Sequence, residues 1–253
     1  MRPPSAPASA PTSASPQVHT RGDLRSLEFH PGMVQSEMRL SRPNDLVLSY
    51  ARAMMCFTLF QPRPEHIVMV GLGGGSLVKF CHRYLPHSRI TVLELRADVI
   101  ALREQFAIPP DDARLRVIEA DAALYMPRLA ASADVLLVDG FDEDGLPSAL
   151  SSAGFYADCR AALRPGGVLV ANLFSYDPHY PAMLGRLRRT FQSRLCWFRG
   201  MCGNNRIVFA VKDGAPSPAL AMQRKVARSR GLRLLAPLNH LLAHWVVWRL
   251  RWQ

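Results

Sequence analysis

The stretch VMVGLGGGS, residues 68–76, decides the fold, because it joins a short apolar run to a turn with four glycines. Glycine lets a backbone turn sharply and lets a ligand approach without a Cβ in the way. An apolar run before the turn and a helical pattern after it predict a strand, a loop and a helix in direct succession. In α/β proteins, a loop of this kind binds part of a nucleotide.

The spacing of the glycines indicates which nucleotide the loop binds. A dinucleotide fingerprint would need a third glycine at position 76, where the chain has Ser76, and no P-loop pattern occurs. Glycines at 71, 73 and 75 suit an adenosyl-sulfonium cofactor better. Glu94 follows the next apolar run, 19 positions after Gly75, and such an acid can accept hydrogen bonds from ribose hydroxyls.

Strands and helices alternate on both sides of this loop. The predicted strands are IVMV (67–70), ITVLEL (90–95), LRVIEA (115–120), DVLLVD (134–139) and VLVANLF (168–174). The predicted helices lie at 76–85, 97–106, 122–130, 152–163 and 181–193, and Arg164-Pro165-Gly166-Gly167 is expected to form a tight connection. This order predicts an α/β, Rossmann-like fold with a mostly parallel, doubly wound sheet. The runs RLCWFRG and RIVFAVK predict an antiparallel hairpin at its C-terminal edge.

Composition shifts divide the chain into four segments. Residues 1–20 are rich in Pro, Ala and Ser, and we expect a disordered tail. Residues 21–64 predict a small β-hairpin and a helix capped by Asn44-Asp45, and residues 65–212 are expected to form the cofactor-binding catalytic domain. Residues 213–253 predict a basic tail that ends in an amphipathic helix.

Charge and cysteine content exclude several classes of protein. The net charge is +11, but eight basic residues and one acid from Lys212 onward leave only +4 for residues 1–211. The body is therefore not expected to bind nucleic acid, and the partner of the basic tail stays unassigned. Five cysteines without a C-x-x-C pair predict neither a disulfide framework nor a metal site. Together with the absence of a secretory signal, this predicts a cytoplasmic protein.

The predicted terminal helix has apolar residues at helical spacing: Leu234, Leu235, Leu238, Leu241, Leu242, Trp245 and Val246. We expect this stripe to pack in the core or against a second copy in a homodimer. Docking on a membrane surface, with tryptophan and arginine at the flanks, is the alternative.

Acidic residues follow two further predicted strands. Asp121 could accept a hydrogen bond from an adenine amino group, or cap the next helix. Asp139 ends its strand, and Asp142 belongs to the acidic run that follows. Carboxylates clustered at a strand end suit a cationic amine substrate, although a solvated loop would have the same composition.

These motifs, in this order, resemble the spermidine synthase (polyamine aminopropyltransferase) family from about Leu24 to Val211. The residues that carry the resemblance are Gln35, Tyr50, the GLGGGS loop, Glu94, Asp121-Ala122 and Asp139-Gly140-Phe141-Asp142. The resemblance implies a class I S-adenosylmethionine-dependent methyltransferase fold and a transferase of polyamine biosynthesis. Its donor would be S-adenosylmethionine or the decarboxylated form, its acceptor a small-molecule amine, and it would need no metal.

The resemblance also implies roles for single residues. The donor would be held by Gln35, Gly71, Gly73, Gly75, Glu94, Asp121 and Ala122. Asp139 and Tyr50 would orient and deprotonate the attacking amine, and Asp142 would help to hold its charge. An ammonium has no lone pair, so a general base is needed before the nitrogen attacks carbon.

Two positions depart from the family pattern. Gly74 stands where the family's loop usually carries Asp, and Arg52 stands where its helix carries Glu. A guanidinium beside the donor would favour the carboxylate of intact S-adenosylmethionine. The alternative is that Arg52 points to solvent on its helix and does not contact the donor. Two alternatives to aminopropyl transfer therefore stay open at this stage: methyl transfer to a small molecule, and an inactive cofactor-binding module that docks a partner.

Overall fold

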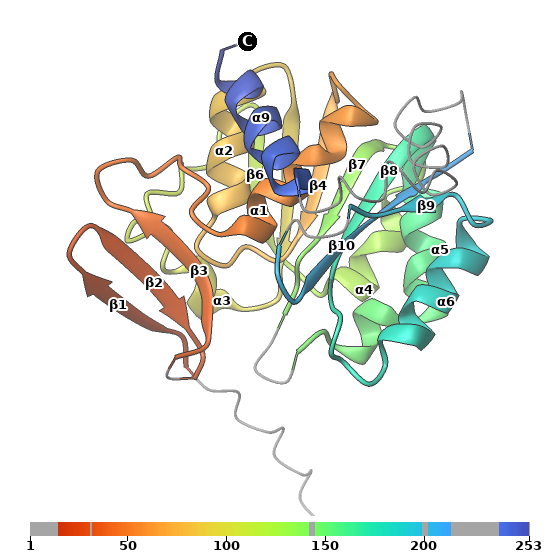
Figure 1. The fold of residues 1–253 in the computed structure, drawn as a ribbon, viewed down its shortest axis with the longest axis horizontal. Coiled ribbons are helices and arrows are strands. Elements are labelled where there is room, and N and C mark those ends of the chain that lie inside the picture. Colours follow the sequence, from red (N-terminus) through yellow and green to blue (C-terminus); the bar gives the residue numbers. More distant parts are fainter. Residues whose placement is uncertain (1–14, 31, 142–144, 199–201, 214–237, 253) are drawn as a thin grey trace, which may run out of the picture.

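The computed structural model describes residues 15–30, 32–141, 145–198, 202–213 and 238–252. Its centre is a seven-stranded sheet in the order β6-β5-β4-β7-β8-β10-β9, in which β4 to β8 are parallel and the last two strands antiparallel (Figure 1). The bounds are β4 His66–Val70, β5 Arg89–Glu94, β6 Leu115–Glu119, β7 Ala133–Val138, β8 Leu163–Phe174, β9 Leu195–Cys196 and β10 Asn205–Val211. The predicted fold class is confirmed, including the antiparallel C-terminal strands.

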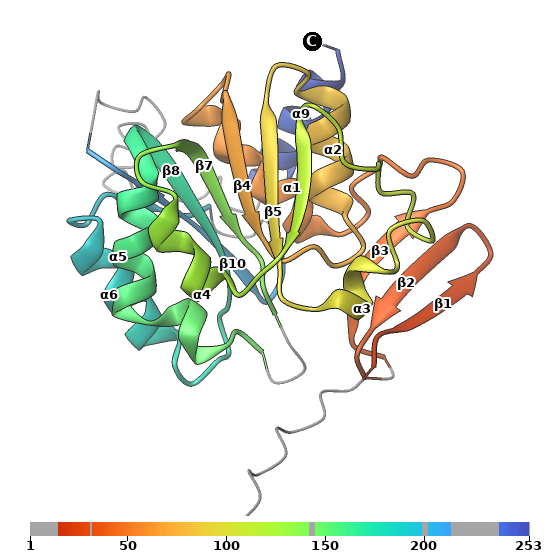
Figure 2. The ribbon, with the colours of Figure 1, turned by 180° about the vertical axis from the view of Figure 1, so that it is seen from behind.

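Helices cover both faces of the sheet, as Figures 1 and 2 show. Strand β4 is buried along its whole length, and its side chains alternate between two apolar clusters. Ile67 and Met69 face the cluster that includes α2, while Val68 and Val70 face the cluster that includes α5 and α6. The helices are α2 Ser76–Tyr84, α3 Ala97–Ile100, α4 Ala122–Tyr125 with η2 Met126–Arg128, η3 Ser148–Ser151, α5 Ala153–Ala162 and α6 Tyr180–Thr190.

Two predicted elements differ from the observed ones. The helix expected over 97–106 is helical only to Ile100, after which the chain continues in turns toward Pro109-Pro110. Beyond Ile100 the backbone hydrogen bonds mostly reach three residues back, from Leu102 N to Val99 O and from Arg103 N to Ile100 O, so the chain forms tighter turns instead of an α-helix. The connection expected at Arg164-Pro165-Gly166-Gly167 lies within β8, because that strand already begins at Leu163.

The N-terminal part is larger than the predicted hairpin. Strands β1 Gln17–Arg21, β2 Leu24–Glu28 and β3 Val34–Arg39 form an antiparallel sheet, followed by α1 Ser49–Met54 and η1 Met55–Leu59. The expected end of the disordered tail at residue 20 is therefore wrong, since residues 17–20 belong to β1. The expected cap at Asn44-Asp45 is also wrong: α1 begins at Ser49, and Asp45 instead accepts a hydrogen bond from Arg251.

Helix α9 Asn239–Arg251 is apolar on two sides and packs against α1 and η1. Its buried side consists of Ala243, Val246, Val247 and Leu250. Of the predicted stripe, Val246 is buried and Leu242 is partly buried, whereas Leu238, Leu241 and Trp245 are exposed, and Leu234 and Leu235 lie outside the described residues. Within the described ranges, no helix is both long and apolar enough to span a membrane.

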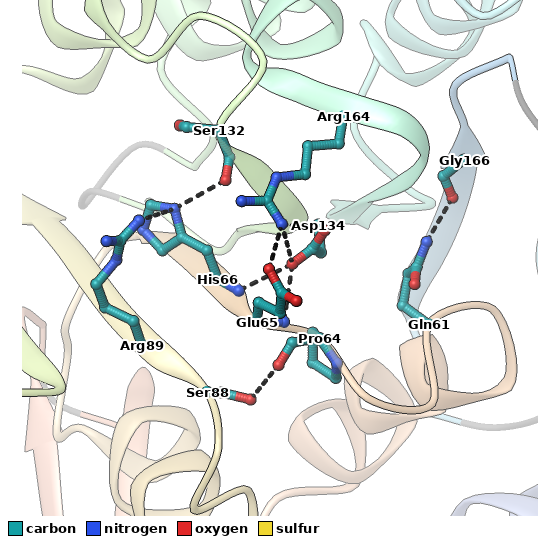
Figure 3. A network of polar contacts seen from close by, with 10 residues as sticks. All are labelled: Gln61, Pro64, Glu65, His66, Ser88, Arg89, Ser132, Asp134, Arg164 and Gly166. Atoms are coloured by element: carbon teal, nitrogen blue, oxygen red, sulfur yellow. Dashed lines mark hydrogen bonds and ion pairs between the residues drawn. The ribbon is translucent and has the colours of Figure 1, made fainter.

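Polar contacts tie together the amino ends of the parallel strands (Figure 3). Asp134 Oδ2 accepts hydrogen bonds from the backbone N–H groups of Glu65 at 2.8 Å and His66 at 2.9 Å. Arg164 Nη1 donates to Glu65 Oε2 at 2.7 Å. Burial lowers the pKa of His66, so its ring stays neutral near pH 7. At the amino ends of the strands, the charged side chains of Asp134, Arg164 and Glu65 are therefore bonded to one another or to nearby backbone groups. The cavity described below lies at the opposite, carboxyl ends.

Candidate active site

A cavity of about 400 Å³ lies at the carboxyl ends of the parallel strands, between the large sheet and the N-terminal sheet. In open α/β sheets, this edge is where ligands bind. The predicted site residues that line the cavity are Gln35, Tyr50, Gly71, Gly73, Glu94, Asp121, Ala122 and Asp139. They come from segments far apart in the sequence, so the fold brings together most of the predicted site.

The glycine loop after β4 packs directly against the loop after β7. Gly71 has a φ of +92°, and a Cβ at this position would lie 2.5 Å from the backbone oxygen of Asp139. Its backbone N–H donates to Leu93 O at 2.9 Å, and the N–H of Asp139 donates to Val70 O at 3.0 Å. Glycine is required at 71 because no side chain fits between these two backbones.

Two acids at the carboxyl ends of the neighbouring strands β5 and β6 accept hydrogen bonds from backbone N–H groups beside the cavity. Glu94 ends β5, and its two carboxylate oxygens accept the backbone N–H groups of Leu72 at 2.7 Å and Arg96 at 2.9 Å. Asp121 caps α4, with Oδ1 accepting from Ala123 N at 2.8 Å. The capping role considered for Asp121 is thus confirmed. Each carboxylate oxygen has a second lone pair, so both acids can also accept bonds from a ligand.

Asp139 follows the end of β7, lines the cavity and is only partly buried. Asn172 Nδ2 donates to Asp139 Oδ1 at 2.8 Å. Burial raises the pKa of Asp139 to about 7, and the hydrogen bond from Asn172, together with the nearby Tyr50 hydroxyl, opposes that rise. A carboxyl group with a pKa close to neutrality can accept a proton during a reaction and release it again afterwards.

Tyr50 on α1 also lines the cavity and interacts electrostatically with this carboxyl group. Its hydroxyl donates to the backbone oxygen of Gln35 on β3 at 3.2 Å. Burial, together with the nearby charge of Asp139, holds the pKa of Tyr50 well above its ordinary value. Tyr50 therefore stays protonated and can orient a group bound beside Asp139, but it cannot serve as a base near neutral pH.

Some predicted positions lie outside the cavity wall. Gly75 has a φ of +65° and caps α2, where a Cβ would come within 2.4 Å of Ile108. Asp142 lies outside the described residues. Arg52 was expected beside the donor, but its guanidinium donates to the carbonyl groups of Leu46 and Val47 and does not line the cavity. The expectation that Arg52 faces the donor is therefore wrong.

Two cavity residues were missed from the sequence. Asn172 on β8 and Asn205 on β10 both line the cavity, and Asn205 Nδ2 donates to Asn172 Oδ1 at 2.9 Å. The available signal was a single amide inside the apolar run VLVANLF. A polar side chain in a strand buried on both faces needs a hydrogen-bond partner, and here that partner is Asp139.

The sheet order and the cavity at the carboxyl edge define a protein of the class I methyltransferase fold. A crystal structure of a probable spermidine synthase from Corynebacterium glutamicum shares this fold, with a TM-score of 0.68 and 21% identity, over 87% of this chain and 90% of that chain. The family model described as "Spermine/spermidine synthase domain" matches residues 48–180.

Curated relatives extend the match over more of the chain. A polyamine aminopropyltransferase of Chromobacterium violaceum is 38% identical over 81% of this chain and 77% of its own length. A polyamine aminopropyltransferase of Neisseria meningitidis serogroup A is 41% identical over 70% of this chain and 68% of its own length. The chain belongs to the spermine/spermidine synthase family, and it is a transferase.

Proposed function

We propose that this protein transfers an aminopropyl group from decarboxylated S-adenosylmethionine to a primary amine of a polyamine. The observation that carries the proposal is Asp139, a carboxyl group with a pKa of about 7 beside Tyr50, in a cavity that also contains the glycine loop. The names of the relatives support the same chemistry. An inactive binding module would not need a base tuned to neutral pH at this position.

The donor is held on the glycine-loop side of the cavity. Gly71 and Gly73 let the adenosyl group approach the backbone, and Glu94 accepts hydrogen bonds from the ribose hydroxyls. Asp121, with the adjacent Ala122, binds the adenine edge, and Gln35 covers the donor from β3. These roles follow the family pattern, and the lining of the cavity supports them.

The acceptor amine binds between Tyr50 and Asp139. Asp139 takes a proton from the ammonium, which gives the nitrogen its lone pair. The nitrogen then attacks the propyl carbon next to the sulfonium, the C–N bond forms and the C–S bond breaks. The electron pair of that bond leaves with sulfur as neutral 5′-methylthioadenosine. Fixing both reactants in line supplies much of the remaining acceleration.

Charge around the cavity favours the decarboxylated donor over the intact one. Among the described lining residues, Arg96 is the single basic side chain, and its guanidinium pairs with Asp98. With Arg52 bound to backbone carbonyl groups, the described wall offers no free guanidinium to a donor carboxylate. Glu94, Asp121 and Asp139 instead make the wall acidic, which disfavours the additional carboxylate of the intact donor.

Mass spectrometry of the products tests the proposal. The protein would be incubated with decarboxylated or intact S-adenosylmethionine and a mixture of diamines and polyamines. We expect an amine that gains an aminopropyl group, with release of 5′-methylthioadenosine, only with the decarboxylated donor. Methylated products from the intact donor would instead establish a methyltransferase, and no product with any amine would contradict both reactions.

Donor binding should depend strongly on Glu94. Replacing Glu94 with alanine removes the ribose acceptor and leaves the N–H groups of Leu72 and Arg96 without their partner. A hydrogen bond to a charged acceptor contributes about 1.5–3 kcal/mol, so affinity for 5′-methylthioadenosine should fall by about 10- to 150-fold. Titration calorimetry measures this. Glu119→Ala, an exposed acid at the end of neighbouring β6, is the matched control, and an equal loss there would contradict the assignment.

A further inference from the structure

We propose that Asn172 and Asn205 form a positioning pair that fixes the orientation of Asp139 and keeps its carboxylate available as the base. The inference rests on the proposed function for its chemistry. Its geometry stands independently: the three side chains extend across the adjacent strands β7, β8 and β10, which lie side by side in Figure 1.

The pair is built into the sheet rather than placed on a loop. Strands β8 and β10 are antiparallel, with Asn172 opposite Ile207 and Asn205 opposite Phe174. Asn172 and Asn205 are therefore diagonal neighbours on one face, a separation that side chains can bridge. Asn172 is only 2% exposed, so its amide depends on Asp139 and Asn205 for its hydrogen bonds.

Asn205 stabilises the orientation of the Asn172 amide in which the donor end faces Asp139. An amide has a donor end and an acceptor end, and rotation by 180° exchanges them. Because Asn205 donates to Asn172 Oδ1, the Nδ2 group points at Asp139 Oδ1. The reversed amide would place its oxygen against a carboxylate oxygen, with no hydrogen between them. Asn205 thus acts on Asp139 without touching it.

In this arrangement the two carboxylate oxygens of Asp139 have different roles: one accepts the hydrogen bond from Asn172, and the other faces the substrate amine. Oδ1 is occupied by Asn172, so Oδ2 remains to accept the proton from the substrate amine. The hydrogen bond to Oδ1 favours the ionised carboxylate and partly offsets the effect of burial. It also persists once Oδ2 is protonated, because Oδ1 is then a carbonyl oxygen. The base would therefore hold one orientation through the proton transfer.

Substitutions at the two asparagines test the pair through the titration of Asp139. In Asn172→Leu the donor is lost, and a hydrogen bond of this kind is equivalent to about one pKa unit or more. The acid limb of the pH profile of kcat/KM should therefore move up by about one unit. Asn205→Asp keeps the size but replaces the donor with an acceptor, which favours the reversed amide. It should raise the acid limb more than Asn205→Ala does.

Asn204→Asp is the matched control, because it adds the same charge one residue away on an exposed side chain outside the hydrogen-bonded chain. The acid limb of this variant should stay within about 0.2 units of wild type. A change in Asn172→Leu or Asn205→Asp as small as in Asn204→Asp would overturn the proposal, and so would equal effects of Asn205→Asp and Asn205→Ala.

A second measurement separates this proposal from the proposed reaction. The carboxyl carbon of Asp139 can be titrated by ¹³C NMR in protein labelled at aspartate, with Asp139→Asn identifying the signal. This titration needs no turnover. If the wild type transfers no aminopropyl group but Asn172→Leu and Asn205→Asp still raise the midpoint, the reaction is wrong and the positioning pair stands. An unchanged midpoint in correctly folded variants rejects the pair whatever the reaction.

Discussion

Replacing Asp139 with asparagine is expected to lower kcat by about 10²- to 10⁴-fold, the usual contribution of a general base. Asparagine keeps the size and can still accept the hydrogen bond from Asn172, but it cannot take a proton. The affinity for 5′-methylthioadenosine should stay near that of wild type, because Glu94 and Asp121 are unchanged. In the wild type, activity should rise with pH through about 7, as Asp139 ionises. Steady-state kinetics from pH 5 to 9 measure both effects.

The stability of the same variant distinguishes a catalytic role from a structural one. Burial raises the pKa of Asp139 in the folded state, so the wild type loses stability as the pH rises from about 4 to about 7. Asp139→Asn does not have this loss, and should be the more stable protein above pH 7. Thermal unfolding at pH 5 and pH 8 measures the difference. A variant that is both active and less stable at pH 8 would show that Asp139 is structural.

Replacing Gly71 with alanine is expected to reduce kcat/KM by about 100-fold or more, since a displacement of about 1 Å near reacting groups has effects of this size. The added Cβ would lie 2.5 Å from Asp139 O and 3.1 Å from the Cα of Gly140. Both contacts are with backbone, so the loop that carries the base must move. Kinetics, combined with circular dichroism to verify folding, provide the measurement.

Two glycines serve as controls for this substitution. Gly22→Ala adds a side chain at a φ of +57° with no atom within 4 Å, so it tests backbone strain alone, far from the cavity. Gly140→Ala meets the end of the Leu150 side chain at 2.8 Å, which can move aside. We expect little change in kcat/KM for the first and a smaller loss for the second. Equal activity in Gly71→Ala and Gly22→Ala would mean that the two loops are not tightly coupled.

The parallel sheet could be predicted because its strands are buried on both faces and therefore form continuous apolar runs between helical stretches. Strand β1 could not, because Gln17–Arg21 is polar, largely accessible and adjacent to the Pro- and Ala-rich N-terminal residues. The start of α1 was misplaced for a different reason. Aspartate is a residue type that commonly caps helices, but the carboxylate of Asp45 instead accepts a hydrogen bond from the distant Arg251. Such a partner is invisible to local spacing.

The candidate site was predictable where residues follow the ends of strands. Glu94, Asp121 and Asp139 share the carboxyl edge because parallel strands end there together. Tyr50 and Gln35 came only from the family resemblance, since nothing local indicates that α1 and β3 fold over this edge. The direction of the Arg52 side chain could not be predicted either. It depends on where α1 begins, and the observed start at Ser49 leaves the carbonyl groups of Leu46 and Val47 within reach of the guanidinium.

The packing of α9 has a consequence for the order in which the protein folds. Its ion pair between Arg251 and Asp45 joins positions 206 residues apart, and its buried face rests on α1, the helix that carries Tyr50. Contacts between such distant residues form late, because the whole intervening chain must first be brought together. A growing chain would thus form its glycine loop and the strand that carries Asp139 before α9 can pack against α1. Mutations in the α9 contact should therefore act mainly on the unfolding rate rather than on the folding rate.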